Sequence, residues 1–585
     1  MSADVCACGR AFAEIAKTIR GEVMIIGIDL GTTNSLVCVY RNKKAELIPN
    51  NLGENLTPSV VSIDEQGNLI VGAVAKERLV SHPDMTAASF KRFMGTDKRI
   101  YLGTKSFTPQ ELSSFVIRQL KEDAEKYIGE EITEAVISVP AYFNDDQRAA
   151  TREAGLLAGL KVERIVNEPS AAALASSMFS GKDEQSYLVF DFGGGTLDVS
   201  IVDYFENVIE IVAVSGDNHL GGNDFDKGIA EYFCKSHELE FGKLTSAQQA
   251  TLLRLAERCK RELTQKDATF LHFEVNGEDK AVVFNNETLV QCCAGLFDRA
   301  SIAVKNALRD SGYAAKDIDE IVLVGGSGKM PIVSYFLESL LGKKPVMIGS
   351  PDEVVAQGVG IYAGIKDRNE EIRDVVLTDI CPFTLGISIL NRNDYKKDIM
   401  SPIIERNTTL PASKSEIYTN TGEHQKEVKI KIYQGESIYC EENLYLGEIH
   451  MEINAQHAYE AQVEVTFSYD INGLLVVDVL DRKNSHTCQK VLLSKSVRLE
   501  QKELEKRIKE LQSYKTNPVG NEKNRLLFAR GERLYQEITG PNRARIMKAL
   551  QQFGEVINNG DRQQIIDLRK SLTEFFDTLE DMYKQ

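Results

Sequence analysis

The chain lacks the features that mark membrane-spanning, secreted or zinc-binding proteins. No apolar run approaches the roughly 18 residues that a membrane span needs, and residues 1–23 contain no apolar core of a signal peptide. The ten cysteines include no C-x-x-C pair for zinc or redox chemistry. We expect reduced thiols, a cytoplasmic location and no membrane partner, with residues 1–23 a disordered extension or a misassigned start.

An excess of basic residues is also missing. The 69 basic residues are outnumbered by 86 acidic ones, giving a formal charge of −17. A nucleic-acid-binding surface needs a positive field, so we expect no nucleic-acid partner. This balance still permits a local cationic pocket for a nucleotide. The length of 585 residues predicts two to four domains.

The hydrophobic pattern changes twice along the chain. Residues 24–371 alternate short β-branched runs with longer helical stretches, which predicts an α/β domain. A short segment at 372–380 separates it from residues 381–497, where period-two alternation predicts an antiparallel β domain. Residues 498–585 show helical stripes, such as Leu504, Ile508 and Leu511, and predict a terminal α-helical unit.

One internal repeat organises the first domain. Ile25–Val39 and Tyr187–Ile201 each contain an apolar strand ending in Asp, a glycine turn with Thr and a second apolar strand. Asp29 and Asp191 are 162 residues apart. Two copies predict a duplicated lobe with a cleft between the copies.

The repeated turns have the chemistry of a phosphate site. Glycine leaves backbone N–H groups free to converge on phosphate oxygens, as at Gly31–Thr33 and Gly193–Thr196. Carboxylates repel phosphate, so Asp29, Asp191 and Asp198 beside these turns make sense only with Mg²⁺ between, held largely through water.

Other nucleotide motifs are missing. The Gly328-Lys329 pair is followed by Met330 and lacks the first glycine of a P-loop, and no G-x-G-x-x-G follows the first strand. The strand and glycine pair at Ile321–Pro331 could lie against a flat base, although a plain strand–helix turn would look the same.

Dense strings in residues 24–500 resemble the DnaK family, the seventy-kilodalton heat-shock chaperones, and in its short tail the chain resembles the HscC-type branch. These strings are IGIDLGTTNS (26–35), FKRFMG (90–95), SVPAYFNDDQRAATREAG (138–155), IVNEPSAAALA (165–175), DFGGGTLDVS (191–200), GDNHLGGNDFD (216–226), ERCKRELT (257–264), VGGSGKMP (324–331), RDVVLTDICPFTLG (373–386), ERNTTLP (405–411) and VEVTFSYDINGLL (463–475).

The resemblance implies a multi-domain α/β + β + α fold. It comprises an actin-like ATPase domain (ribonuclease-H-like and duplicated), an interdomain linker at 372–380, a β-sandwich peptide-binding domain and a short α-helical lid. It also implies an ATP-hydrolysing chaperone that binds and releases unfolded polypeptide, with ATP or ADP, Mg²⁺ and K⁺ as cofactors. The implied partners are a J-domain co-chaperone, whose contact we expect at Arg164, and a nucleotide-exchange factor.

The same resemblance implies roles for individual residues. The catalytic positions are Lys91, Glu168, Thr196 and Asp191, and the cation positions are Asp29, Asp191 and Asp198. The nucleotide-binding positions are Gly31, Thr32, Thr33, Gly193, Gly194, Gly195, Thr196, Gly221, Gly222, Glu257, Lys260, Thr264, Gly325, Gly326, Ser327, Lys329 and Asp352. The allosteric positions are Pro140, Arg148, Val375, Val376, Leu377 and Asp379, and the peptide-groove positions are Ile387, Tyr418, Val428 and Ile430.

The sequence departs from the family pattern at several positions. Asn223 replaces a glutamate, Lys329 replaces an arginine that stacks on adenine, and Thr378 replaces an apolar linker residue. A lysine stacks less well than a planar guanidinium, which predicts weaker nucleotide binding. The helical tail is short, which predicts weak closure over the β domain. A small-molecule kinase or a filament-forming ATPase of the same fold is the alternative, and residues 381–497 speak against the kinase.

Overall fold

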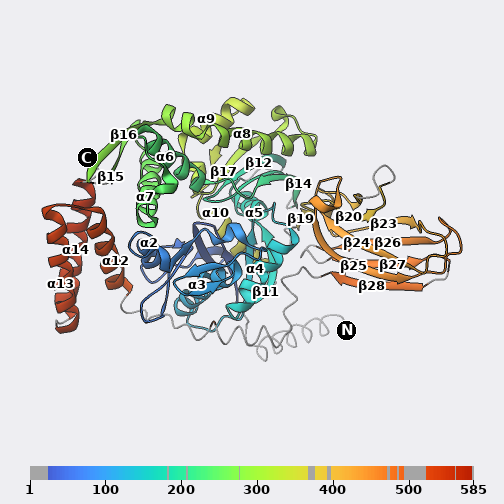
Figure 1. The fold of residues 1–585 in the computed structure, drawn as a ribbon, viewed down its shortest axis with the longest axis horizontal. Coiled ribbons are helices and arrows are strands. Elements are labelled where there is room, and N and C mark those ends of the chain that lie inside the picture. Colours follow the sequence, from blue (N-terminus) through green and yellow to red (C-terminus); the bar gives the residue numbers. More distant parts are fainter. Residues whose placement is uncertain are drawn as a thin grey trace, which may run out of the picture.

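The computed structural model describes residues 24–180, 184–205, 208–275, 277–366, 376–391, 397–470, 475–483, 486–492, 511, 522–559 and 562–582. Residues 1–23, Val375 and the stripe residues Leu504 and Ile508 lie outside these ranges. In Figure 1 the two α/β lobes lie one above the other, with the helix bundle at the left end of the long axis and the β domain at the right end. Within the described ranges, no helix is both long enough and apolar enough to cross a membrane.

The first lobe is built on a sheet in the order β11-β10-β1-β2-β3, with β4 paired to β2. The sheet strands are β1 (Ile25–Asp29), β2 (Asn34–Arg41), β3 (Lys44–Leu47), β4 (Thr57–Pro58), β10 (Glu134–Val139) and β11 (Lys161–Asn167). Smaller strands are β5 (Val60–Ile63), β6 (Leu69–Val71), β7 (Thr86–Ala88), β8 (Ile100–Leu102) and β9 (Lys105–Phe107). The helices are α2 (Ala73–Ser81), η1 (Pro83–Met85), η2 (Phe90–Phe93), α3 (Pro109–Ile128), α4 (Asp145–Leu157) and α5 (Glu168–Ser180).

The second lobe repeats this sheet. Its order is β18-β17-β12-β13-β14, and β12 pairs antiparallel with β13 and parallel with β17, as β1 does with β2 and β10. The strands are β12 (Glu184–Phe192), β13 (Leu197–Phe205), β14 (Val208–Asp217), β15 (Ala268–Val275), β16 (Glu278–Asn285), β17 (Glu320–Val324) and β18 (Val346–Met347). The helices are α6 (Gly222–Ser236), η3 (Phe241–Lys243), α7 (Ser246–Glu262), α8 (Asn286–Ser311), η4 (Ala315–Asp317), η5 (Gly326–Lys329), α9 (Pro331–Leu341) and α10 (Val354–Lys366). The predicted duplication is confirmed.

The two lobes join where α5 crosses α10. Between the separate lobe cores lies a third buried cluster, formed by alanine-rich α5, the inner face of α10 and strands of both sheets. The helices approach closely because Gly358 has no side chain: a Cβ there would lie 1.8 Å from the carbonyl oxygen of Ala171. The glycine therefore sets the spacing of the two lobes.

The β domain consists of two antiparallel sheets over one apolar core. Their orders are β21-β20-β24-β25 and β23-β26-β27-β28. The strands are β20 (Leu385–Ile389), β21 (Ile399–Ile404), β22 (Thr409–Leu410), β23 (Ala412–Thr419), β24 (Glu427–Gln434), β25 (Leu444–Glu452), β26 (Gln462–Tyr469), β27 (Leu475–Asp481) and β28 (His486–Leu492), with the short helix η7 (Cys440–Glu442) before β25. The predicted β-sandwich is confirmed.

Residues 376–380 of the predicted linker form a strand in the structure. β19 (Val376–Ile380) pairs in parallel with β14 and antiparallel with β22, so it extends the sheet of the second lobe. Period-two alternation could not reveal this strand because it is short and its partner lies about 170 residues earlier in the chain.

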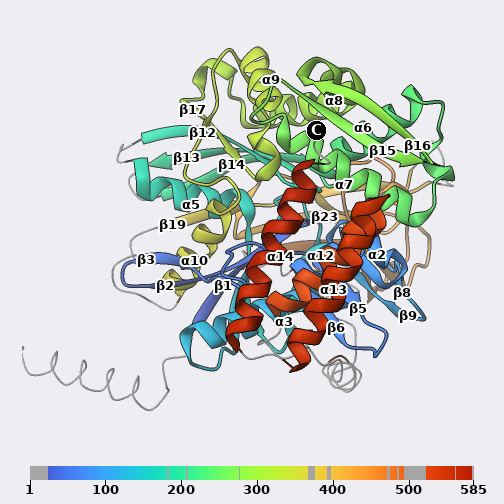
Figure 2. The same cartoon turned by 90° about the vertical axis from the view of Figure 1, so that its left-hand side faces the viewer.

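The terminal helices α12 (Glu522–Glu537), α13 (Pro541–Asn559) and α14 (Arg562–Met582) form a bundle with its own apolar core. Figures 1 and 2 place this bundle against α2 and α7, at the end of the lobes away from the β domain. The described part of the tail thus covers the lobes rather than the β domain. Leu511 is buried in the core of the first lobe, where Arg118 donates to its carbonyl oxygen at 3.0 Å.

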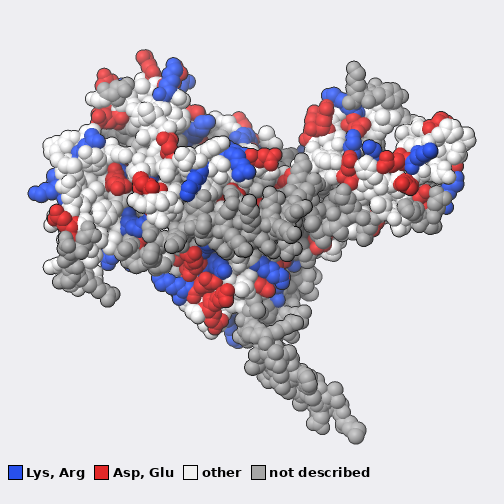
Figure 3. All heavy atoms as spheres, turned by 60° about the horizontal axis from the view of Figure 1, so that its bottom comes forward, with Lys and Arg blue, Asp and Glu red and all other residues white. Residues whose placement is uncertain are grey.

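Polar contacts hold the β domain to the lobes. Asp145 at the start of α4 donates its N–H to Gln434 at 3.0 Å and accepts from the Tyr469 hydroxyl at 2.6 Å. Arg406 forms a 2.8 Å ion pair with Asp310 of α8. On the face shown in Figure 3, acidic and basic side chains are interspersed over the lobes and the β domain.

We expect Gly358→Ala to destabilise the lobes, because the added methyl group would collide with the backbone of α5. Overpacking of this kind costs about 1–3 kcal/mol, and calorimetry should show a lower unfolding temperature. Gly295→Ala is the matched control: Gly295 is also helical, and its added Cβ would meet nothing within 4 Å. Equal unfolding temperatures for the two variants would contradict this account of the crossing.

Candidate functional site

The two glycine turns face each other across the junction of the lobes. A Cβ added to Gly194 would lie 1.8 Å from Thr33 Oγ1, and one added to Gly195 would lie 2.5 Å from Thr32 Cγ2. Gly221 closes the second turn from behind, because its Cβ would lie 2.4 Å from the Gly195 nitrogen. Glycine is therefore required for the turns to approach, and backbone N–H groups from both lobes line one small space.

Three carboxylates lie beneath the turns. Asp29 ends β1 and accepts from Ser138 Oγ at 2.7 Å, whereas Asp191 and Asp198 face each other across the β12–β13 ladder. Burial raises the pKa of Asp29 and of Asp198 to about 7, and the charge of Glu168 adds to both shifts. Burial likewise raises the pKa of Asp191, reinforced by Glu168 and the other two aspartates. Asp191 and Asp198 are buried and Asp29 is partly buried, so the negative charges of these three carboxylates favour a bound cation.

The donor set fits a hydrated cation better than a directly bound one. Within the described residues, no group of three His, Cys, Asp or Glu side chains is arranged to hold a metal ion by itself. The buried Thr33 hydroxyl lacks a hydrogen-bond partner there. This orphaned oxygen and the raised carboxylate pKa values are what a hard cation bound through water and phosphate oxygens would relieve.

A buried lysine side chain also lies at this cluster of carboxylates. Lys91, on η2, is 3% exposed and donates to Glu168 at 2.8 Å. Its Nζ also lies 5.5 Å from the centre of the Phe143 ring. The structure therefore brings together Lys91, Glu168 and the three aspartates, which come from four separate segments of the sequence. Thr196 lies in the turn above them and is also buried.

The residues predicted to lie beside the nucleotide base come from α6, α7 and η5. Lys260 donates to the Gly222 carbonyl at 2.9 Å and pairs with Asp226 at 2.7 Å. Ser327 donates to the Gly193 carbonyl at 2.8 Å, which ties η5 to the glycine turn. Glu257 accepts from Lys76 at 3.2 Å, a contact between the lobes.

The remaining predicted positions lie at the edge of this side. Lys329 pairs with Asp352, and a Cβ on Gly326 would lie 2.5 Å from that carboxylate. Gly325 has φ +78°, and a Cβ there would lie 2.5 Å from the Phe192 carbonyl. Thr264 lies beyond the end of α7, the helix that carries Glu257 and Lys260.

Sequence reasoning missed several polar residues of the site. Arg92 of the first lobe donates to the Gly195 carbonyl at 3.1 Å and pairs with Asp224 of the second. Asn223 donates to Ser89 Oγ at 2.9 Å, a further contact between the lobes. Asp226, the partner of Lys260, was missed too. Each lies inside a string that marked the family, but the pairings depend on the approach of the lobes.

A chain of polar contacts leads from this site to the β19 strand. Asn167, next to Glu168, donates to both oxygens of Asp379 at 2.7 Å. Arg148 donates to Asn167 Oδ1 at 2.6 Å and to the Phe143 carbonyl, which belongs to the turn that begins at Pro140. Burial raises the pKa of Asp379, while the Arg148 charge opposes that shift. Asn167 was not predicted.

The other predicted positions lie in the linker and the β domain. The backbone of Val376 is in β19, and Leu377 packs partly buried on the interlobe cluster. Ile387 and Ile430 are 3% and 5% exposed in the β-domain core, with Tyr418 and Val428 packed partly buried beside them. The Tyr418 hydroxyl lies 3.1 Å from Ser401 Oγ.

Comparison with known proteins gives a consistent result. The family model described as Hsp70 protein matches residues 25–576. The chain is 38% identical over 568 residues to the chaperone protein DnaK of Thermotoga petrophila and to that of Thermotoga maritima, covering 94% of this chain and 92% of each relative. It is 37% identical over the same length to the DnaK of Thermotoga neapolitana.

We expect Gly221→Ala to weaken Mg-ATP binding about tenfold or more, because the methyl group would push the second glycine turn out of position. Isothermal titration of the purified chain measures the affinity. Gly242→Ala is the control, since its Cβ would meet open space. An unchanged affinity in the Gly221 variant, with the fold intact, would show that the facing turns do not bind the nucleotide.

Proposed function

The chain belongs to the Hsp70 family of ATP-hydrolysing chaperones, and from this premise we propose which residues bind the nucleotide, hydrolyse it and transmit its state to bound polypeptide. The observation that carries the proposal is the pair of glycine turns facing each other over three buried carboxylates. Nothing found favours the kinase alternative.

ATP or ADP binds with its phosphates between the two turns and its base against α7 and η5. The backbone of Gly31–Thr33 and Gly193–Thr196 holds the phosphates. Glu257, Lys260, Ser327 and Lys329 lie on the side of the base, with Gly221, Gly222, Gly325, Gly326 and Asp352 setting the backbone around it. Asp29, Asp191 and Asp198 hold Mg²⁺ and K⁺ largely through water, and these cations offset the charge of the phosphates.

Hydrolysis depends on charged side chains that are already in position beside the terminal phosphate. Lys91 has its ammonium group fixed by Glu168 in a buried site, where a positive charge stabilises developing negative charge far more than it would in water. Glu168 and Thr196 orient the attacking water, with the Asp191 carboxylate beside them.

Polypeptide binds in the β domain as an extended segment, held by backbone hydrogen bonds and an apolar pocket around Ile387, Tyr418, Val428 and Ile430. The route Glu168–Asn167–Asp379 links its affinity to the nucleotide, because Asp379 lies in the strand that fastens the β domain to the second lobe. Pro140 and Arg148 set the position of Asn167. The docked strand is stabilised by the pairing of the Val376 backbone with β14 and by the packing of Leu377 on the interlobe cluster.

The remaining proposals concern partners and location. A J-domain co-chaperone contacts the surface around Arg164, whose guanidinium lies 4.8 Å from the Tyr362 ring centre near Asp379. A nucleotide-exchange factor acts on the lobes, and the chain works in the cytoplasm, consistent with its cysteine usage.

Lys91→Met should lower the single-turnover rate of ATP hydrolysis by about 10²–10³-fold, since a fixed charge beside the transferring group is lost. The affinity for ATP should change only a few-fold. Lys98→Met, an exposed lysine on the same segment, should keep the wild-type rate. Hydrolysis at the wild-type rate in the Lys91 variant would remove Lys91 from the mechanism.

Asp379→Ala should uncouple the two domains while basal ATP turnover stays within about threefold of the wild type. Fluorescence anisotropy of a labelled extended peptide, with and without ATP, measures the coupling. ATP should weaken peptide binding in the wild type and in the exposed-carboxylate control Asp97→Ala, but not in Asp379→Ala. A normal ATP response in the Asp379 variant would exclude this route.

A further inference from the structure

Asn223, at the start of α6, joins the second glycine turn to a segment of the first lobe. Its backbone N–H donates to the Gly194 carbonyl at 2.9 Å, and its side-chain Nδ2 donates to Ser89 Oγ at 2.9 Å. The Asn223 side chain also lies against the turn itself, because a Cβ added to Gly194 would be 3.6 Å from Asn223 Oδ1. One residue therefore connects the turn predicted to hold phosphate with the opposite lobe.

Ser89 is the residue at which the chain turns from β7 into η2, the short helix that carries Lys91. Its backbone has φ +56°, in the left-handed region that residues other than glycine rarely adopt. The Ser89 carbonyl accepts the N–H of Arg92 at 3.2 Å and so closes the first turn of η2. A hydrogen bond to the Ser89 side chain therefore acts at the point that sets the direction of η2.

Two contacts from α6 hold η2 on either side of Lys91. Asn223 bonds to Ser89, two residues before Lys91, and Asp224 pairs with Arg92, the residue after it. Lys91 itself is 3% exposed. A 3₁₀ helix of four residues has few hydrogen bonds of its own, and their geometry is poor. The position of the Lys91 side chain therefore depends on the contacts that flank it.

We propose that Asn223 is a positioning residue for ATP hydrolysis: its bond to Ser89 holds η2, and through η2 the ammonium group of Lys91, beside the terminal phosphate. The inference rests on the role given to Lys91 in the proposed function. Because α6 belongs to the second lobe and η2 to the first, the bond ties the catalytic charge to the closed arrangement of the lobes. An amide donates this bond without adding negative charge to a site already rich in carboxylates.

Single-turnover hydrolysis and ATP affinity, measured separately on the full-length chain, test this role. Asn223→Ala should slow hydrolysis about three- to tenfold, because a small displacement of a reacting group is costly. The dissociation constant for ATP should stay within about twofold of the wild type, since only the placement of Lys91 changes. Asn306→Ala in α8 is the matched control: Asn306 is also an asparagine of intermediate exposure in a helix of the second lobe, and its variant should keep the wild-type rate.

Two double variants separate positioning from other roles. Adding Asn223→Ala to Ser89→Ala should cause no further loss, because the bond is already absent, and adding it to Lys91→Met should cause none, because the positioned group is absent. An equal further loss in the Lys91→Met background would refute the proposal, since Asn223 would then act independently of Lys91.

The remaining outcomes distinguish this inference from the proposed function. If Asn223→Ala hydrolyses ATP at the wild-type rate while Lys91→Met is slow, the positioning role is wrong and the proposed function stands. If Lys91→Met itself keeps the wild-type rate, the proposed role of Lys91 is wrong, and the role of Asn223 fails with it.

Discussion

The structure depends on three carboxylates of like charge being held close together at the junction of the two lobes. Asp29, Asp191 and Asp198 come from strands of two lobes, and in each of them burial raises the pKa. An isolated cluster of this kind costs free energy, and Lys91 supplies one buried positive charge against it. The remaining imbalance favours a bound cation. In the proposed function, the phosphates of the nucleotide would bring cations to this junction and so complete its electrostatics.

The duplication makes the two lobes similar at their junction, but the lobes also differ, and one difference concerns the link to the β domain. Each lobe contributes a strand that ends in Asp and a glycine turn. Only the second lobe carries an added strand, β19, on the outer edge of its sheet. Glu168 and Asn167 are neighbours in sequence but serve different sites, one paired to Lys91 and the other to Asp379. Because the two residues are adjacent, a shift of the peptide bond between them would change both contacts.

The sequence predicted the features that local patterns determine. The repeat of strand, glycine turn and strand foretold two matching sheets, and the period-two alternation foretold the β-sandwich. It did not predict features that arise only when distant segments meet. Nothing near Asn167 points to Asp379, 212 residues away, and the apolar stripe of the tail does not reveal that α12 docks on α2.

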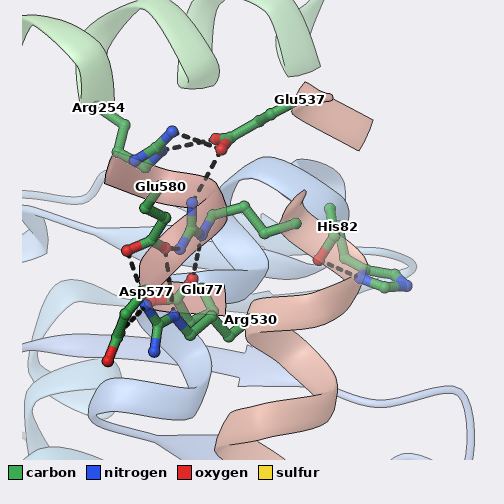
Figure 4. A network of polar contacts seen from close by, with 9 residues as sticks. Glu77, His82, Arg254, Arg530, Glu537, Asp577 and Glu580 are labelled. Carbon is green, nitrogen blue, oxygen red and sulfur yellow. Dashed lines mark hydrogen bonds and ion pairs between the residues drawn. The ribbon is translucent and has the colours of Figure 1, made fainter. Parts of the chain in front are cut away.

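The tail also illustrates why length alone misleads. A short helical unit suggested poor closure over the β domain, yet the same unit buries Arg533 and Ala529 against the lobes. Buried arginine is stable only with its carboxylate partners in place, so the ion-pair network favours one position of the bundle over loose association. One of those partners, Glu77, lies in α2 of the first lobe, and the other two, Glu537 and Glu580, lie in the bundle, so the network drawn in Figure 4 fixes this short helical unit on the first lobe.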